Sequence, residues 1–280
     1  LATLYEQLAA EPLPAADDDA LLPALAERFK RAVAAVMQSR PARGLEAALR
    51  EIERRQIDAW AELFAQQHAD YQRTWAALDL PPQPTHFEAR FGSPRRAGDA
   101  AAGRAPTVDA PLELPVVVDG QAATARFTGQ IDRIDVGRVG DLTVFTVIDY
   151  KTSARAAVKP DEIRAGRQLQ LVLYALAVAE LNLAGPGAVP LSAGYWSIQG
   201  AGYGQRGGAK ALPIHEVQPG RLVPAAGWDE LRAQLAERIG AMIAAIRRGE
   251  FPVYNADPQC TAFCDLRTTC RIGHIRNLEK

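Results

Sequence analysis

Hydrophobic residues recur at helical spacing along the first third of the chain. In residues 20–38 apolar side chains return every three or four positions, and residues 43–79 repeat the pattern. The apolar positions are Leu21, Leu25, Phe29, Val33 and Val36, then Leu49, Ile52, Leu63, Phe64, Tyr71, Trp75 and Leu78. Pro81, Pro82 and Pro84 follow, and a proline does not continue a helix. The pattern predicts amphipathic helices that end before residue 85 and whose plainest role is packing.

The middle of the chain changes to short apolar and β-branched runs, which are typical of strands. The runs cover residues 87–91, 114–118, 123–136 and 142–148, and later 193–198 and 212–217. Asp119-Gly120 and the segment 137–141 are hairpin signals between neighbouring runs. Residues 92–110, rich in Gly, Ala, Pro and Arg, predict a mobile loop.

Helical spacing returns in the second half. A helix is expected to begin at Pro160, which suits a first turn, and to present Ile163, Arg167, Gln170 and Tyr174 on one face until glycines stop it near residue 185. Another helix is expected over residues 228–248. Helices interleaved with strands predict an α/β fold, with a central mixed sheet of about five strands flanked by helices and preceded by a helical N-terminal extension.

Composition and charge narrow the function. The 280 residues are 48% hydrophobic with a net charge of −1, so no strongly basic surface is expected, and contact with nucleic acid needs a local groove or a partner subunit. The longest apolar stretch, residues 171–179, is too short to span a bilayer, so no membrane association is expected. The chain starts at Leu1 without a signal-like segment. We expect a piece of a longer cytoplasmic protein.

Charged residues stand where the strand 142–148 ends. Asp149 and Lys151 are two positions apart, so their side chains project from the same face of a strand. A hairpin through 137–141 brings Asp132, on the preceding strand, toward them. A turn aspartate and a surface ion pair between Asp149 and Lys151 are the plain alternatives. The functional alternative is that the two carboxylates hold a hard divalent cation with an ammonium beside them, which is an arrangement suited to metal-assisted phosphodiester hydrolysis.

Three sequence blocks together resemble a known family. Gly129-x-x-Asp132-Arg133-x-Asp135, then Asp149-Tyr150-Lys151-Thr152, then Gln170-x-x-x-Tyr174 are similar to the motifs of the PD-(D/E)XK nuclease superfamily, and within it to the nuclease domains of RecB/AddB-type helicase–nucleases. The resemblance runs from Phe87 to the C-terminus and implies a restriction-endonuclease-like core. An Asp-x-Lys alone would carry no information.

The resemblance implies a role for each matched residue. Asp132, Asp149 and the backbone carbonyl of Tyr150 would hold Mg²⁺ or Mn²⁺, and Lys151 would orient the attacking water and offset charge on the scissile phosphate. Gln170 and Tyr174 would lie beside the metal and the DNA backbone. Gln168 competes with Gln170 for the glutamine position, and the tyrosine favours Gln170. The family often has a glutamate where Glu88 stands, although a solvated strand glutamate is at least as good an interpretation.

Other polar residues are open to several interpretations. Arg133 and Asp135 fall on the strand face opposite Asp132, where an ion pair is the default and a phosphate contact by Arg133 is the alternative. The four histidines are scattered, which favours core or surface roles. Residues 1–5 resemble the segment that follows a metal-ligating histidine of the family, so we expect that ligand upstream.

The three cysteines lie within eleven residues, as Cys260-x3-Cys264-x5-Cys270. In a cytosolic chain such clustering favours metal ligation over disulfides. AddB-type relatives hold a four-iron, four-sulfur (4Fe-4S) cluster with three C-terminal cysteines and one upstream, and the first gap here is one residue longer than theirs. A fourth ligand is absent from this chain and would come from upstream residues. Zinc with another fourth ligand and free thiols are the alternatives.

The sequence therefore predicts a magnesium-dependent DNA exonuclease within a helicase–nuclease for double-strand break repair. Its partners would be a single-stranded DNA end and a helicase domain or subunit. A catalytically silent DNA-binding or scaffolding module and a stand-alone RecB-like defence nuclease are the rivals. Three parts are expected, namely a helical segment (1–84), a nuclease core (85–250) and a cysteine-bearing tail (251–280).

Overall fold

The computed structural model describes most of the chain. The described ranges are residues 20–38, 42–93, 107–152, 156–200, 202–203, 211–218 and 221–251, with residues 260, 264, 265, 269 and 270. Residues 1–5, His274 and most of the cysteine-bearing tail lie outside these ranges, so the structure does not test the expectations for them. The division into three parts stays a prediction.

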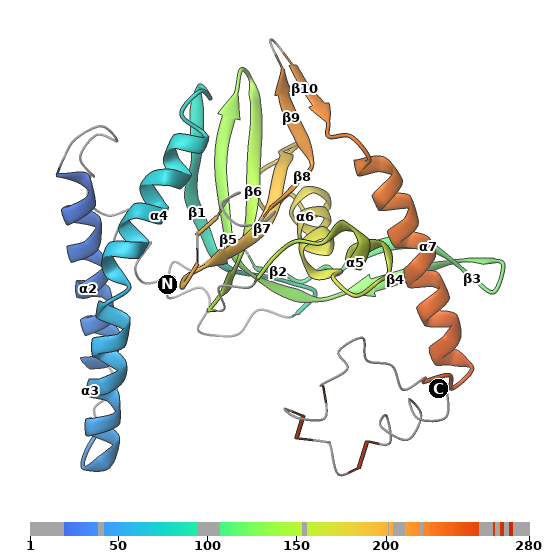
Figure 1. The fold of residues 1–280 in the computed structure, drawn as a ribbon. Helices are drawn as coiled ribbons and strands as arrows, with labels where there is room; N and C mark the ends of the chain where they lie inside the picture. Colours follow the sequence, from blue (N-terminus) through green and yellow to red (C-terminus); the bar gives the residue numbers. More distant parts are fainter. Residues whose placement is uncertain are drawn as a thin grey trace.

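A six-stranded mixed sheet forms the centre of the molecule (Figure 1). Its strand order is β2-β1-β5-β6-β7-β8, with bounds β1 Leu80–Phe91, β2 Thr107–Val108, β5 Gly129–Val139, β6 Leu142–Lys151, β7 Val189–Ser197 and β8 Ala211–Pro213. The pairs β1–β5, β5–β6 and β7–β8 are antiparallel, whereas β6–β7 and β1–β2 are parallel. The predicted α/β fold with a mixed sheet is confirmed, with one strand more than expected.

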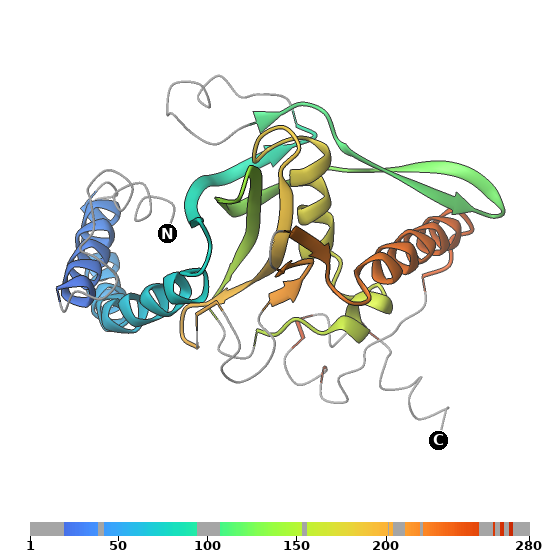
Figure 2. The ribbon, with the colours of Figure 1, turned by 90° about the horizontal axis from the view of Figure 1, so that it is seen from above.

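Helices cover both faces of the sheet, as Figure 2 shows from above. One face carries α5 (Pro160–Arg164), α6 (Gln170–Glu180) and α7 (Trp228–Arg247), and the other carries α2 (Leu21–Gln38) and α4 (Ala61–Thr74). α3 (Leu45–Asp58) lies against α2. Successive side chains of β6 point to opposite faces of the sheet. Phe145 and Val147 therefore join the core under α6, whereas Ile148 joins the core under α2 and α4. No helix in the described ranges is both long and apolar enough to cross a bilayer.

The helical segment before the sheet differs from its prediction in two ways. The helix expected over residues 43–79 is interrupted at residues 59–60, because α4 packs its apolar face on the sheet whereas α3 buries no residue. The prolines after it do not precede the first strand but lie inside β1. They are tolerated there because β2 pairs only with Arg90 and Phe91, which leaves the earlier part of that edge of β1 without a strand partner in the described chain.

The helix expected to begin at Pro160 is also divided. α5 ends at Arg164 and α6 begins at Gln170. Gly166, between them, has φ +78°, and a Cβ there would lie 2.2 Å from Met242 Cε and 2.8 Å from Arg238 Cγ of α7. α5 ends locally at this left-handed glycine, because the Gly166 amide donates to the Ile163 carbonyl at 2.9 Å and the Arg167 amide donates to the Glu162 carbonyl at 2.7 Å. The close approach of α7 also favours glycine at this position.

The strand material around the sheet corrects further expectations. The run expected over residues 123–136 is divided between β4 (Gln121–Phe127) and β5, and β4 pairs with β3 (Leu112–Val118) in a separate two-stranded sheet. This hairpin packs against α7, where Gly240 admits the Val117 carbonyl. The run expected over residues 212–217 is divided between β8 and β9 (His215–Gln218), and β9 pairs with β10 (Arg221–Pro224), which had not been expected.

Candidate active site

Asp132 and Asp149 lie opposite each other on neighbouring strands. β5 and β6 pair with Arg133 opposite Ile148, so one further step of the register brings Asp132 opposite Asp149. Residues opposite each other across a strand pair project from the same face. Asp132 Oδ2 also accepts a hydrogen bond from the Tyr150 amide at 3.0 Å, which ties this carboxylate to the end of β6. The tertiary structure thus gathers the two carboxylates that the sequence singled out.

Lys151 completes the group at the end of β6. Its Nζ lies 2.6 Å from Asp149 Oδ2 and 5.3 Å from the centre of the Tyr195 ring. The Lys151 side chain is 38% exposed, whereas that of Asp149 is 5% exposed. Partial burial alone would lower the pKa of Lys151, but the hydrogen bond and the charge of Asp149 outweigh it and raise that pKa. An ammonium is therefore held at the open side of the carboxylates.

Glu88 lies beside the same carboxylates. Its neighbours on β1 pair with β5, Phe87 with Arg133 and Ala89 with Ile131, so Glu88 sits across from Asp132. Its φ of 55° is in the left-handed region, which a non-glycine residue seldom adopts. Sequence reasoning left Glu88 undecided, and no residue pattern indicates that the strand is distorted at this point.

The environment of Asp132 disfavours an uncompensated negative charge. Burial is the largest cause that raises the pKa of Asp132, and the carboxylates of Asp149 and Glu88 add to it. The hydrogen bond from the Tyr150 amide and the charge of Lys151 oppose the rise without cancelling it. Like charges near a partly buried carboxylate are stabilised when a cation is bound between them.

The donor set fits a hard divalent cation. Oδ2 of Asp149 is buried, and within the described chain Lys151 is the one cation in reach of it. No three His, Cys, Asp or Glu side chains of the described residues gather as a metal-binding group. Two carboxylates with a backbone carbonyl suit Mg²⁺, because that ion keeps several of its waters and needs few protein ligands. The carbonyl of Tyr150, between Asp149 and Lys151, stays the predicted third ligand.

Gln170 and Tyr174 lie on α6, over the start of β5. Gln170 Nε2 donates to the Tyr174 hydroxyl at 3.1 Å, and the Tyr174 ring meets the Phe91 ring edge to face at 6.2 Å between centroids. Gly129, the glycine of the first motif, admits both rings, because a Cβ there would lie 2.8 Å from Phe91 Cζ and 3.1 Å from Tyr174 Cε1. Within the described chain neither Gln170 nor Tyr174 hydrogen-bonds to Asp132, Asp149 or Lys151.

Arg133 and Asp135 form a buried ion pair on the other sheet face. Two guanidinium nitrogens, Nε and Nη2, lie 2.5 Å from the two carboxylate oxygens, and both side chains are fully buried. The Tyr71 hydroxyl of α4 donates to the same carboxylate at 2.8 Å. The predicted ion pair is confirmed. The alternative phosphate contact of Arg133 is wrong, because the side chain has no exposed surface and lies under α4.

Gln67 fastens α4 to the end of β7. Its amide nitrogen donates to the carbonyls of Ser197, Ile198 and Gly200 at 3.2, 3.0 and 2.7 Å, and its carbonyl accepts from Trp196 Nε1 at 2.9 Å. The Ile198 amide in turn donates to the Lys151 carbonyl at 2.9 Å. The helical segment is therefore bonded to the turn that lies against the end of β6. Sequence reasoning missed Gln67, which carries no motif.

The histidines in the described ranges lie outside the site. His68 is buried between the rings of Phe64 and Trp196, and burial, followed by the charge of Arg133, lowers its pKa to about 3. His215 Nδ1 lies 2.7 Å from the Pro190 carbonyl. His86, on β1, is partly buried, which lowers its pKa. The expected core and surface roles fit these three positions.

The predicted cysteine cluster is not gathered in the described part of the chain. Cys260, Cys264 and Cys270 are partly buried and form no disulfide. They do not meet each other or another described ligand as a metal-binding group. The iron–sulfur cluster therefore stays a prediction.

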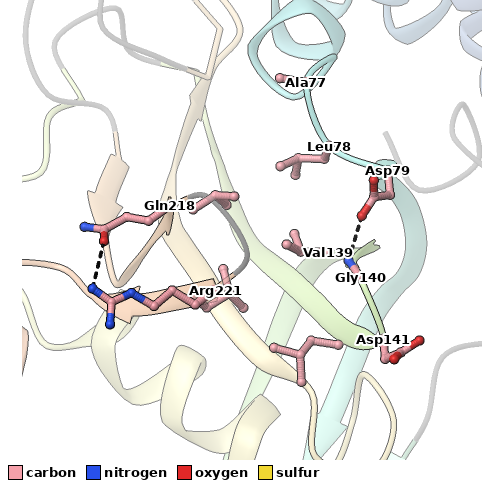
Figure 3. A pocket seen from close by; sticks show the side chains of 11 residues that line it. Ala77, Leu78, Asp79, Val139, Gly140, Asp141, Gln218 and Arg221 are labelled. Carbon is pink, nitrogen blue, oxygen red and sulfur yellow. Dashed lines mark hydrogen bonds between the residues drawn. The ribbon is translucent and has the colours of Figure 1, made fainter.

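A hollow of about 570 Å³ lies at the end of β5 and β6 that is opposite to Asp132 and Asp149. Figure 3 shows it between the β5–β6 turn, the start of β1 and the β9–β10 hairpin. The Gly140 amide donates to Asp79 at 2.6 Å on one wall, and Arg221 donates to Gln218 at 3.4 Å on the other. None of the predicted site residues lines it.

Comparisons with known proteins agree with the geometry. The family model described as the PD-(D/E)XK nuclease superfamily matches residues 1–271. A curated relative from Limosilactobacillus fermentum, one of the subunits of an ATP-dependent helicase/deoxyribonuclease, is 29% identical over 168 residues. That alignment covers 59% of this chain and 13% of the relative, so the chain matches a small part of a much longer protein.

Proposed function

Because the chain belongs to the PD-(D/E)XK nuclease superfamily, we propose that it hydrolyses phosphodiester bonds of DNA with Mg²⁺ or Mn²⁺ at Asp132 and Asp149. The observation that carries the proposal is the pairing of these two carboxylates across β5 and β6, with the Lys151 ammonium 2.6 Å from Asp149. A structural ion pair between Asp149 and Lys151 alone gives no reason for the second carboxylate, Asp132.

The residues of this chain have distinct parts in the reaction. Asp132, Asp149 and the Tyr150 carbonyl would hold the cation, which when bound acidifies a water and offsets negative charge on the phosphate. Lys151 lies at the open side, where its ammonium can orient the attacking water and stabilise the extra charge of the transition state. Its contact with the Tyr195 ring restrains that ammonium. Water attacks phosphorus and releases a proton to solvent, the ester P–O bond breaks, and the leaving oxygen takes up a proton from solvent.

Gln170 and Tyr174 are proposed to support the DNA backbone next to the carboxylates. Their mutual hydrogen bond fixes the Gln170 amide on the first turn of α6. A neutral amide that donates to a phosphate oxygen positions the strand without adding charge. Gln168 has a different part, because its amide oxygen accepts from the Lys159 amide at 2.9 Å and its amide nitrogen donates to the Ala157 carbonyl at 3.2 Å.

We further propose that this nuclease works within a helicase–nuclease and degrades a single-stranded end that a helicase domain or subunit delivers. The name of the Limosilactobacillus fermentum relative, which joins helicase and deoxyribonuclease, supports this. An exonuclease preference, a role in double-strand break repair and a 4Fe-4S cluster at Cys260, Cys264 and Cys270 belong to the same proposal. A silent scaffold is disfavoured because Asp132, Asp149 and Lys151 are all present and adjacent.

Cleavage of labelled linear and circular single-stranded DNA by Asp149→Asn tests the proposal. We expect the variant to lose cleavage with Mg²⁺ and with Mn²⁺ by a factor of about 100 or more, the usual cost of losing transition-state charge stabilisation. Asp141→Asn is the matched control, since this exposed carboxylate lies at the far end of the same hairpin. Degradation of linear but not circular DNA would identify an exonuclease. Cleavage by Asp149→Asn at the wild-type rate would overturn the assignment.

A further inference from the structure

A small hollow opens on the Lys151 side of the candidate active site. It has a volume of about 390 Å³, and its lining residues are Lys151, Thr152, Ala156, Ala157, Lys159, Gln168 and Tyr195. Lys151 and Tyr195 also belong to the environment of Asp149, so the hollow and the carboxylates share a wall. The volume is at the lower end of the range of about 300–1,000 Å³ that small-molecule sites occupy.

The backbone of Lys159, one of the lining residues of this hollow, is held by hydrogen bonds. Its amide donates to Gln168 Oε1 at 2.9 Å, and its carbonyl accepts from the Ile163 amide at 3.1 Å. Gln168 Nε2 also donates to the Ala157 carbonyl at 3.2 Å. The amide oxygen and the amide nitrogen of Gln168 therefore both bond to the backbone of the segment 157–159, and these two bonds fix the position of the Lys159 backbone.

The Lys159 ammonium is paired with no carboxylate among the described residues, although its charge, after that of Arg167, helps to lower the pKa of Glu162. Within the described chain the Lys159 side chain makes no ion pair, although two carboxylates follow it in α5. Asp161 is paired with Arg164 at 2.8 Å, and Glu162 is paired with Arg167. The hollow thus carries two lysines, of which Lys151 has one carboxylate partner and Lys159 has none at ion-pair distance in the described residues. Such a site favours an anion.

We propose that this hollow binds a second phosphate of the DNA strand, one that neighbours the scissile phosphate, and that Lys159 is its ligand. The inference rests on the proposed function, since it assumes a DNA strand at Asp132 and Asp149. Ala156 and Ala157 add apolar surface to the lining, which suits the uncharged sugar, and Thr152 and Gln168 add polar groups. Contact with a neighbouring phosphate fixes the register of the strand over the carboxylates and carries no sequence preference.

The test measures binding in EDTA, which prevents cleavage, with the full chain and a labelled single-stranded oligonucleotide at several salt concentrations. Lys159→Ala should lower the affinity about threefold to fivefold at low salt, as expected for one partly exposed charge contact. It should also reduce the slope of log affinity against log salt by about 0.7, the value for one phosphate of a single strand. Lys159→Arg should keep the slope. Lys30→Ala is the matched control, because Lys30 lies on α2 beside Glu27.

A scan with single neutral methylphosphonates locates the contact. At one position next to the scissile phosphate, the substitution should weaken binding by wild type and leave binding by Lys159→Ala unchanged. Equal losses for both proteins at every position, or an unchanged salt slope in Lys159→Ala, would overturn the inference. These outcomes are independent of the cleavage assay, so a loss of activity in Asp149→Asn with an unchanged slope in Lys159→Ala would reject the second phosphate site alone. If Lys159→Ala gives the expected salt slope and methylphosphonate pattern but Asp149→Asn still cleaves DNA at the wild-type rate, the catalytic assignment alone would be rejected.

Discussion

Replacing Asp135 by Asn should destabilise the protein by about 3–5 kcal/mol, because it leaves the Arg133 guanidinium buried without its counter-charge. Both side chains are 0% exposed, and the pair is joined by two contacts of 2.5 Å. The Tyr71 hydroxyl contributes a further hydrogen bond of 2.8 Å to the carboxylate. Since Asn and Asp have nearly the same volume, the substitution creates no cavity, and the cost comes from charge and hydrogen bonding.

The measurement is urea unfolding with the slope of the unfolding free energy against urea compared between variants. Glu113→Gln is the matched control. Its carboxylate pairs with Arg126 at 2.9 Å between β3 and β4, but the two side chains are 71% (Arg126) and 54% (Glu113) exposed. An exposed pair of this kind contributes less than about 1 kcal/mol. The comparison therefore isolates the effect of burial on the same type of ion pair.

A double variant sharpens the test. Arg133→Met with Asp135→Leu removes both charges, so it should be less destabilised than Asp135→Asn, even though the Tyr71 hydroxyl loses its acceptor at a cost of about 1–3 kcal/mol. If Asp135→Asn has an unfolding free energy no lower than that of Glu113→Gln, and the urea slope is unchanged, the reasoning is refuted. This result would mean that the guanidinium is stabilised enough by the rings of Tyr71 and Trp196, whose centroids lie 5.4 and 5.1 Å from it.

Two further predictions concern pH and metal. His68 has a folded pKa of about 3 against an ordinary value of 6.5, so its contribution to stability is present above pH 6.5 and is lost as the pH falls. Wild type should lose about 2 kcal/mol more unfolding free energy than His68→Phe between pH 7 and pH 5, and equal losses in parallel urea titrations would contradict this. Iron and sulfide should copurify with an anaerobically prepared longer protein that includes the upstream fourth ligand, and should disappear in Cys264→Ala, because thiolates hold such clusters. Zinc without iron would indicate a zinc site instead.

The residues of the site and its strands could be predicted from the sequence because their signals are local. Asp149 and Lys151 follow an apolar β-branched run, and a two-residue spacing in a strand places both on one face whatever surrounds them. The hairpin that brings Asp132 to them is short, so few alternatives exist for its pairing. Likewise, side chains alternate between the two faces of a strand, so the sequence places Arg133 and Asp135 on the face opposite to Asp132.

The partners across the sheet were decided only by the tertiary structure. Nothing in the pattern around Arg133 shows that α4 covers it with Tyr71, and that cover turns a possible phosphate ligand into a buried ion pair. The same holds for Gln67, whose bonds join residues about 130 positions apart. Contacts of this range depend on how the layers pack, which local periodicity does not encode.

Element boundaries also differ from the expected ones. The helical spacing from Pro160 to Tyr174 is unbroken in the sequence, yet Gly166 ends α5 in a left-handed conformation, at a position where a Cβ would overlap Met242 and Arg238 of α7. This break separates Lys159 from Gln170 and lets Gln168 hold the segment beside the hollow. The sequence by itself therefore determined the family, and it singled out the two carboxylates and the lysine of the candidate site. Lys159 is held by Gln168, nine positions along the chain, which lies in the break between α5 and α6. The surroundings of Glu88 and Gln67 were decided by the tertiary structure, because segments distant in the sequence meet there.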